Sequence, residues 1–271
     1  MIRSNPHTHT NYVDGKSPAR EQIEAALQLG FVSLGFSEHA PEGDPKQFCG
    51  LTSEDRDRYV AEINALKKEY EGRLRVWLGM EIDRISDESG EGLDYFIGAS
   101  HYFLADGAHA GVDGDADRLE AFVNAHFGGN WKKAVETYFE EYAASIERRP
   151  PSIIAHFDLI RKNNFKRHWF EEDTAFIACG KAAMERMIRC CDLMELNLGG
   201  LLRSGQKTPY PLPELLAHWR RLGGRVIPST DCHYSPLLAA PAMTEDYLRE
   251  AGYREYVRLG EKDALFVTEK L

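Results

Sequence analysis

The stretch PHTHT near the start of the chain places two histidines in alternate positions. In an extended segment successive side chains point to opposite faces, so His7 and His9 share one face while Thr8 points to the other. Two neighbouring imidazoles form a chelating pair for zinc, manganese or iron, and Asp14 follows in the next few residues. An isolated pair of this kind is also typical of a polar chain end with chance histidines. The metal interpretation therefore depends on further ligands elsewhere in the sequence.

Further residues of metal-ligating type recur where the sequence predicts the ends of strands. Parallel strands of a barrel bring their carboxyl ends to one mouth, so distant positions of this kind would meet in one pocket. In the stretch Asp231-Cys232-His233 the two outer side chains share a face, and Cys232 is expected to be a small buried thiol. The candidate metal ligands are His7, His9, Asp14, His39, Glu81, His101, His156, Asp231 and His233.

The size of this set predicts more than one metal ion. A catalytic zinc takes about three protein ligands, so nine candidates indicate two or three divalent ions. Glu81, a carboxylate among histidines, is predicted to bridge two of them. A hydroxide between the ions would reduce their repulsion and would supply a nucleophile for attack on a phosphoryl group near neutral pH. Imidazole and carboxylate ligands suit zinc, iron or manganese alike. The other histidines are expected to be structural or solvated: His109, His126, His168 and His218.

Length and composition favour a single α/β domain of enzyme size. The chain has 271 residues, of which 43% are hydrophobic, and its net charge is −10. An acidic chain is a poor candidate for binding nucleic acid or an anionic membrane, which would need a basic surface. The five cysteines include no CxxC spacing, so we expect reduced thiols and a cytoplasmic location. We expect neither a signal peptide nor a membrane span, and the sequence leaves the oligomeric state open.

Apolar, β-prone runs alternate along the chain with longer stretches of helical period. Seven strands are expected, at 1–10, 31–39, 74–83, 95–103, 152–160, 193–198 and 225–233. Helices are expected between them at 17–29, 52–70, 131–149, 171–191 and 213–222. This alternation predicts parallel βα units, in either an open doubly wound sheet or a closed barrel. The Gly-, Asp- and Ala-rich stretch 104–130 is expected to be a surface excursion near the mouth, and 244–271 a small C-terminal appendage.

Several motifs, taken together, resemble the PHP (polymerase and histidinol phosphatase) superfamily. They are HTH near the start, SEHAP, the Gly-x-Glu that ends the third strand, SHYF, AHFDLIRK and TDCH, in matching order over essentially the whole chain. More narrowly, the stretches SEHAPEG, GMEIDR, AHFDLIRK and ELNLGGLLRSGQKTPYP are similar to the histidinol-phosphate phosphatases of that superfamily. The resemblance implies one domain, 1–271, folded as a distorted (β/α)7 barrel with a trinuclear metal site at the C-terminal ends of the strands.

The resemblance also implies which residues share each ion. One ion would take His7, His9, Glu81 and Asp231. The second would take Glu81, His101 and His156, and the third Asp14, His39 and His233. Cys232 stands where the superfamily usually has Ala or Ser, and little effect on the ligand set is expected because its side chain should face away from the metals.

Four charged residues are candidates for contacts with a substrate. Arg161 lies just beyond the fifth strand and Arg203 just beyond the sixth, so both belong at the barrel mouth, where a guanidinium would bind phosphate. Glu42 and Asp44, in the loop after the second strand, could face a cationic group of the substrate.

The resemblance and these residues together predict hydrolysis of L-histidinol phosphate to L-histidinol and phosphate. The catalytic residues would be Glu81, as the bridge, and Asp231 or His233, which could pass a proton to the leaving alkoxide directly or through a metal-bound water. The sequence does not choose between the last two.

Three other functions compete with this prediction. The first is a PHP phosphoesterase that acts on another small phosphomonoester or on a phosphodiester. The second is a non-catalytic metal-binding PHP domain, which the intact ligand set disfavours. The third is a metallo-amidohydrolase of a related barrel, which would need an activated lysine or a mononuclear ligand pattern at the strand ends.

Overall fold

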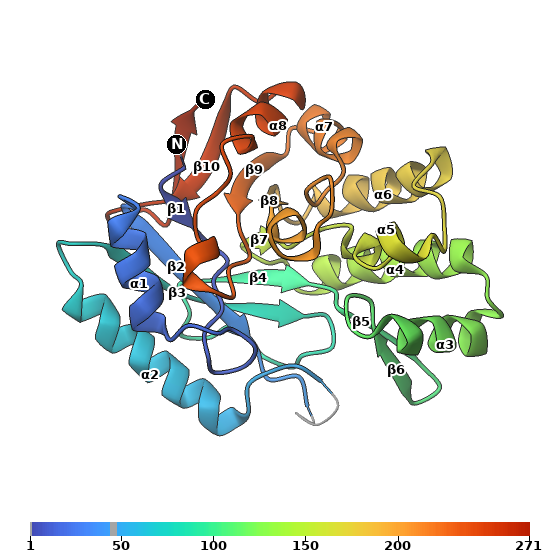
Figure 1. Ribbon diagram of the computed structural model, residues 1–271, viewed down its shortest axis with the longest axis horizontal. Helices are drawn as coiled ribbons and strands as arrows, with labels where there is room; N and C mark the ends of the chain where they lie inside the picture. The colour runs from blue at the N-terminus through green and yellow to red at the C-terminus, as the bar shows by residue number, and fades with distance from the viewer. Residues whose placement is uncertain (1, 44–47) are drawn as a thin grey trace.

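Seven parallel strands form one sheet that is nearly closed into a barrel, as the computed structural model shows for residues 2–43 and 48–271 (Figure 1). Neighbouring strands are β1, β2, β3, β4, β7, β8 and β9 in that order, and every pair is parallel. Their bounds are Ser4–Asn5, Ser33–His39, Arg75–Asp83, Tyr95–Ala99, Ile153–Ile154, Leu193–Asn197 and Arg225–Ser229. The expected distorted (β/α)7 barrel is confirmed.

The two edge strands approach each other beyond their ends. A parallel bridge joins Thr8 to Cys232. The His9 amide donates to the Cys232 carbonyl at 2.8 Å, and the Cys232 amide donates to the His7 carbonyl at 2.9 Å. The HTH and TDCH segments, which carry predicted metal ligands, are therefore held side by side by backbone hydrogen bonds.

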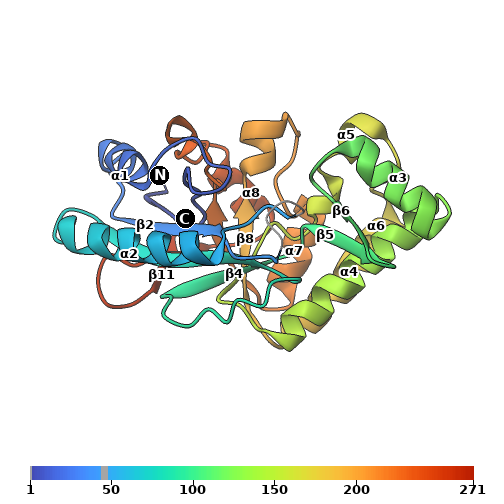
Figure 2. The same cartoon turned by 90° about the horizontal axis from the view of Figure 1, so that it is seen from below.

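Helices cover the outside of the sheet (Figures 1 and 2). The longer ones are α1 (Ala19–Gln28), α2 (Ser53–Glu69), α3 (Ala116–Phe127), α4 (Trp131–Arg148), α6 (Thr174–Met187) and α7 (Pro213–Arg221). Short helices are α5 (Asn164–Arg167) and α8 (Thr244–Glu250). Side chains of Thr52, Asn130 and Asp173 accept hydrogen bonds from the first-turn amides of α2, α4 and α6, which explains why these helices begin where they do. No helix among the described residues is long and apolar enough to cross a membrane.

One tyrosine fills the inside of the barrel below the strand ends. The Tyr95 hydroxyl donates to the Pro6 carbonyl, and the residue is buried. Its ring fits because two neighbouring strands carry glycine: a Cβ on Gly79 would lie 2.5 Å from the ring, and one on Gly35 would lie 2.2 Å from the hydroxyl oxygen. Real Cβ atoms do not approach so closely, so these glycines are needed for the barrel to close around Tyr95.

Several strands are shorter than the sequence predicts, and the last of them, β9, ends at Ser229 rather than at residue 233. β1 ends at Asn5 because Pro6 follows and has no N–H to donate to a ladder. β7 comprises only Ile153–Ile154, and the chain then turns into the 3-10 segment η1 (Leu159–Arg161). The predicted strand 95–103 is divided into β4 and β5 (Tyr102–Ala105), which leaves the barrel and pairs with β6 (Ala108–Gly111) as an antiparallel hairpin.

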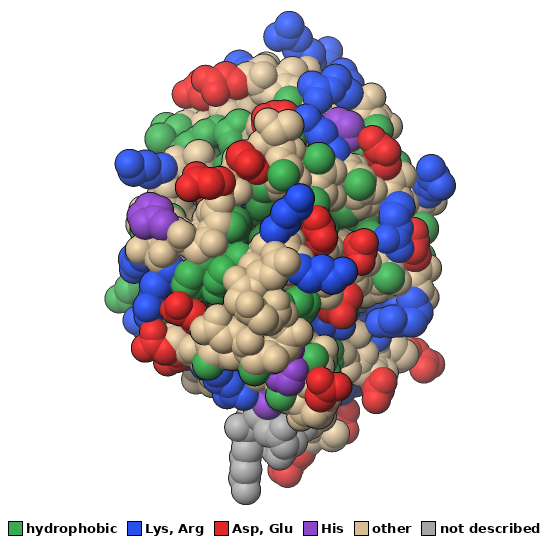
Figure 3. All heavy atoms as spheres, turned by 90° about the vertical axis from the view of Figure 1, so that its right-hand side faces the viewer, with side chains coloured by type: hydrophobic (Ala, Val, Ile, Leu, Met, Phe, Trp, Pro, Cys, Tyr) green, Lys and Arg blue, Asp and Glu red, His purple; other side chains and the backbone are tan. Residues whose placement is uncertain are grey.

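The stretch 104–130 contains the helix α3, which the sequence analysis does not predict. Asp115 caps its start, Gly128 ends it with φ of 60°, and its buried face consists of Leu119, Phe122 and Val123. The Gly- and Asp-rich residues before it conceal this short apolar pattern. On the face of the molecule that includes α3 and the β5–β6 hairpin, basic and acidic side chains are interspersed (Figure 3). The stretch 244–271 contains α8 and the antiparallel pair β10 (Glu255–Leu259) and β11 (Phe266–Lys270).

Candidate metal centre

The structure brings all nine predicted metal ligands together at the carboxyl ends of the strands. His7, His9 and Asp14 follow β1, His39 and Glu81 lie on β2 and β3, and the others follow β4, β7 and β9. Groups of their donor atoms lie within 4.8 Å of one another: His9, Asp14, His39 and His233 form one group, and His7, His156 and Asp231 form another. Two further groups are His7, His9 and Glu81, and His39, Glu81 and His101. We call these nine side chains the ligand cluster.

Glu81 lies at the centre of the ligand cluster and divides it. Its Oε1 is 2.8 Å from His156 Nε2 and 3.3 Å from His101 Nε2. Its Oε2 is 3.1 Å from His39 Nδ1 and 3.4 Å from His7 Nε2. Burial would raise the pKa of Glu81, but the imidazoles around it hold that pKa well below its ordinary value. The carboxylate therefore stays ionised and presents one oxygen to each half of the cluster, which suits a bridge between two ions.

The outer part of the cluster is formed by Asp14 and three imidazoles. Asp14 Oδ2 is 3.0 Å from His233 Nε2 and 3.7 Å from His39 Nε2. The rings of His9 and His233 are stacked, with their centroids 4.1 Å apart. The group of three that the resemblance implies for the third ion thus also includes His9, and His39 faces both Asp14 and Glu81.

Unpartnered imidazole nitrogens show that the cluster fits metal ions. His7 Nε2, His9 Nε2 and His39 Nδ1 are buried and make no hydrogen bond. Such atoms are costly in a folded protein, about 1–3 kcal/mol each. The opposite ring nitrogens of two of these histidines contact acids: His7 Nδ1 lies 2.7 Å from Glu195, and His9 Nδ1 lies 3.3 Å from Glu38. A carboxylate beside one nitrogen and no protein hydrogen-bond partner on the other is the usual arrangement of a metal-binding histidine.

Three acids that orient the histidines were missed by the sequence analysis. They are Glu38, Glu195 and Asp83, all fully buried. Glu195 also accepts a hydrogen bond from the His156 amide at 3.0 Å, and Asp83 Oδ2 lies 3.1 Å from His101 Nδ1. Each is an acid inside a strand that is otherwise buried, where an unpaired charge is rarely tolerated. That position was the available signal, because it implies a cationic or N–H partner.

Glu195→Gln is expected to weaken metal binding by about 10–100-fold, the usual cost of losing a carboxylate that orients a ligating histidine. The substitution keeps the shape of the side chain but removes the charge beside His7 Nδ1. Zinc affinity measured against a competing chromophoric chelator tests this. Glu214→Gln, which changes an exposed acid paired with Lys181, is the control and should bind zinc as the unchanged chain does. Equal affinities for the two variants would contradict the role of Glu195.

The pKa of His39 predicts how the metal-free protein responds to pH. Burial lowers that pKa, but Glu81 and Asp14 outweigh the burial and raise it to about 10. A raised folded-state pKa gives stability that is fully present below the unfolded value of 6.5 and is lost as the pH rises through 10. In excess chelator, the free energy of unfolding should therefore fall between these values. Urea unfolding at successive pH values tests this, and His39→Gln should flatten the slope; a rising free energy would contradict it.

The two predicted phosphate-binding arginines lie in different environments. Arg203 lines the cavity at the ligand cluster and contacts Asp231 and His233. Arg161 does not line it: the side chain is buried, and its donors are bonded to Asp158, Glu172 and Thr208. Its neighbour Lys162 does line the cavity, with Nζ 2.9 Å from Asp113. A phosphate contact by Arg161 stays a prediction, one that requires these ion pairs to open.

Glu42 lies beside the cluster rather than on the cavity wall. It is buried, its two carboxylate oxygens have no hydrogen-bond partner, and a donor atom of each of Glu42, Asp83 and His101 lies within 4.8 Å of the others. Burial, followed by the charge of Asp83, raises the pKa of Glu42 well above its ordinary value. The raised pKa favours the neutral form of Glu42, which suits a cationic substrate group less well than a carboxylate does, and this contact stays a prediction. Asp44 lies outside the described residues.

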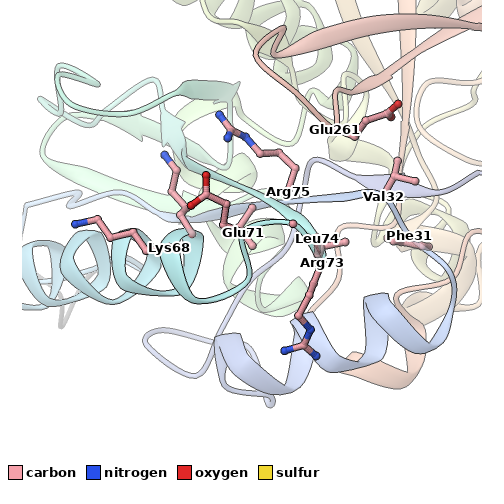
Figure 4. Close-up of a pocket in the computed structure, with 11 residues that line it drawn as sticks. Phe31, Val32, Lys68, Glu71, Arg73, Leu74, Arg75 and Glu261 are labelled. Atoms are coloured by element: carbon pink, nitrogen blue, oxygen red, sulfur yellow. The ribbon is translucent and has the colours of Figure 1, made fainter.

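The cavity at the cluster is small, about 60 Å³, and is lined by charged and imidazole groups. A larger cavity of about 520 Å³ lies elsewhere, between the end of α2 and the starts of β2 and β3 (Figure 4). Its charged side chains include Lys68, Arg73 and Arg75, which point in different directions rather than toward one another. None of the described residues that line it belongs to the ligand cluster, whereas seven of the nine cluster residues line the smaller cavity.

Comparison with known proteins agrees with this fold. The family model described as the PHP domain matches residues 5–187. The chain therefore belongs to the PHP domain family.

Two relatives of this chain carry the name histidinol-phosphatase. A Schizosaccharomyces pombe protein named "Probable histidinol-phosphatase" is 26% identical over 86% of this chain and 80% of its own length. The histidinol-phosphatase of Bacillus subtilis is 28% identical over 60% of this chain and 68% of its own length.

Two solved structures share the fold. The hisK protein of Listeria monocytogenes superposes with a TM-score of 0.76 at 21% identity and covers 89% of this chain and 99% of its own. Histidinol phosphate phosphatase of Lactococcus lactis, solved with zinc, L-histidinol and phosphate, has a TM-score of 0.64 at 16% identity. It covers 96% of this chain and 97% of its own.

Proposed function

We propose that this chain is a metal-dependent phosphomonoesterase that hydrolyses L-histidinol phosphate to L-histidinol and phosphate. The observation that carries the proposal is the ligand cluster, whose buried imidazole nitrogens are left open beside an ionised Glu81. The substrate follows from the histidinol phosphatases among its relatives and from the Lactococcus lactis protein that was solved with histidinol and phosphate.

The ligand cluster would hold two or three divalent ions, with zinc, iron and manganese all suited to imidazole and carboxylate ligands. Glu81 would be shared between ions, and Glu38, Glu195 and Asp83 would orient the imidazoles. Bound ions would supply Lewis-acid activation of the phosphoryl group and of the attacking water. Two observations support divalent metal binding: the Lactococcus lactis structure contains zinc, and the buried imidazole nitrogens of this chain have no hydrogen-bond partner.

The cavity wall supplies the groups that bind phosphate and move a proton. Arg203 and Lys162 line the cavity and offer cationic N–H donors to phosphoryl oxygens. Asp231 Oδ1 and His233 Nδ1 lie 3.4 Å apart on the same wall. Either group is placed to hold the proton that passes to the departing alkoxide of the substrate, which is too basic to leave without it.

The partner of this site is a small phosphorylated molecule rather than a polymer or a membrane surface. The cavity is narrow, and the chain carries a net charge of −10, which opposes the approach of long polyanions. We place the reaction in the cytoplasm, since all five cysteines are free thiols, as is usual in a reducing compartment.

Release of phosphate from L-histidinol phosphate, measured beside sugar phosphates, nucleotides and a phosphodiester, tests the proposed function. We expect kcat/KM for L-histidinol phosphate to exceed that for every other compound by at least about 100-fold, because a specific site binds the whole transition state. Similar slow rates for all monoesters would leave a general phosphatase and would remove the histidinol phosphate assignment. A faster rate for the phosphodiester would favour the competing phosphodiesterase.

A further inference from the structure

Arg203 makes two close contacts with the ligand cluster. Its Nη2 donates to Asp231 Oδ2 at 2.7 Å, and its Nη1 lies 2.6 Å from His233 Nδ1. The arginine belongs to a π-helical turn, η2 (Gly200–Ser204), that follows β8. Gly199 makes the approach possible, because a Cβ there would lie 3.0 Å from both Arg203 Nη2 and Asp231 Oδ2. The two contacts are thus built into the local backbone.

The contact with His233 determines where that histidine carries its proton. A guanidinium has N–H donors and no acceptor, so Arg203 can only donate, and Nδ1 must accept with its lone pair. A neutral imidazole has one N–H, which must then be on Nε2. His233 Nε2 lies 3.0 Å from Asp14 Oδ2, an acceptor that suits this N–H. In this arrangement Nε2 has no lone pair to offer to a metal ion.

A second arrangement of the same histidine is available in the structure. His233 Nδ1 also lies 2.9 Å from the backbone carbonyl of Asp231. Without Arg203, the proton can be on Nδ1 and be donated to this carbonyl. The Nε2 lone pair then faces Asp14 Oδ2, in the group that also contains His9 and His39. This tautomer is the one that can bind an ion, with a backbone carbonyl as the orienting acceptor.

We propose that Arg203 is a positioning residue that controls metal binding by His233 through the tautomer of its ring. While Arg203 is bonded to Asp231 and His233, the ion position formed by Asp14, His39 and His233 is closed. When an oxyanion of the phosphate class draws the guanidinium into the cavity, His233 is released in the binding tautomer. Occupancy of this ion position and binding of the phosphoryl group therefore favour each other, and by linkage the coupling is reciprocal. The inference rests on the metal cluster of the proposed function but requires no particular substrate.

Nitrogen NMR of the metal-free chain of 271 residues tests the first step. Long-range ¹⁵N–¹H correlation at neutral pH, with His233→Gln used to assign the signals, should show the Nε2–H tautomer of His233 in the unchanged chain. Arg203→Met should convert this ring to the Nδ1–H tautomer. An Nδ1–H tautomer in the unchanged chain, or no conversion in the variant, would overturn the proposal.

Zinc titration against a competing chelator tests the second step. We expect Arg203→Met to tighten the weakest zinc by about tenfold, within the usual range of coupling between two sites. His233→Gln should abolish that zinc, which identifies it. Lys162→Met is the matched control, because it removes another cation from the same cavity without touching His233. It should change the affinity for the weakest zinc by less than about twofold.

Two results of the titration would overturn the proposal. Equal tightening in Arg203→Met and Lys162→Met would show a general effect of charge, and no tightening in Arg203→Met would show that Arg203 does not oppose the ion. Neither measurement uses turnover. If both measurements give the expected results but the chain does not hydrolyse L-histidinol phosphate, the proposed substrate is wrong and the proposed role of Arg203 in metal binding still holds.

Discussion

Glu81→Gln is expected to lower kcat/KM for phosphate release by at least about 1,000-fold, which corresponds to about 4 kcal/mol of lost transition-state stabilisation. Glu81 is the side chain that presents one oxygen to His101 and His156 and the other to His7 and His39. Glutamine keeps the shape but has a single oxygen and no charge. It can no longer offset the charge of ions on both sides, so the metal content of the purified variant should fall as well.

Steady-state kinetics and elemental analysis of the same preparations measure both effects. Glu147→Gln is a suitable control, because it changes an exposed acid on α4 whose partner is Arg186. It should keep full activity and full metal content. Circular dichroism of Glu81→Gln should match that of the unchanged chain, so that loss of activity is not loss of fold. Full activity of a correctly folded Glu81→Gln would contradict the bridging role.

Removal of the metal ions is expected to abolish activity and to lower the melting temperature by roughly 10–20 °C. An ion at 100 times its dissociation constant stabilises the native state by about 2.7 kcal/mol, so two ions contribute roughly 5 kcal/mol, and each kcal/mol moves the midpoint of a domain this size by about 2–4 °C. The structural reason is that His7, His9 and His39 each keep a buried nitrogen without a hydrogen bond when no ion is bound.

Differential scanning calorimetry of the chain before and after dialysis against a chelator measures this shift. Adding back zinc, manganese or iron(II) separately should restore both the midpoint and activity, and the metal that restores most is the best candidate for the native one. Glu195→Gln should show a smaller difference between its metal-loaded and metal-free midpoints at equal metal concentration. An unchanged midpoint after complete removal of metal would contradict the stabilising role of the cluster.

The alternation of strands and helices could be predicted because its signals are local and repeated, whereas the closed barrel was implied by the resemblance to the PHP superfamily. Strands such as β2 and β3 are buried on both faces and therefore are short apolar runs between amphipathic helices. The helix α3 was not predicted because its apolar face is short and follows a Gly- and Asp-rich stretch. The hairpin of β5 and β6 was not predicted because Tyr95–Phe103 is one continuous β-prone run in the sequence, and only tertiary packing divides it.

The ligand cluster could be predicted for a similar reason, since parallel strands bring their carboxyl ends together whatever their separation in sequence. The acids that orient the histidines could not be paired in this way. Glu195 contacts His7, which lies 188 positions away in the sequence. No local spacing in the sequence can predict such a contact. The environment of Arg161 was equally hidden, because its partners Glu172 and Thr208 come from two later segments of the chain.

Anomalous diffraction from crystals of the metal-loaded chain tests the central claim most directly. We predict one peak near the Nε2 atoms of His7 and His9 and one oxygen of Glu81, and a second peak near the other oxygen of Glu81. Each peak should lie about 2.0–2.2 Å from these atoms, the distances usual for zinc with imidazole and carboxylate ligands. Peaks on opposite sides of the Glu81 carboxylate would establish it as a bridge. A cluster without peaks in crystals that hold metal elsewhere, or a single ion that leaves His7 and His9 unligated, would contradict the account.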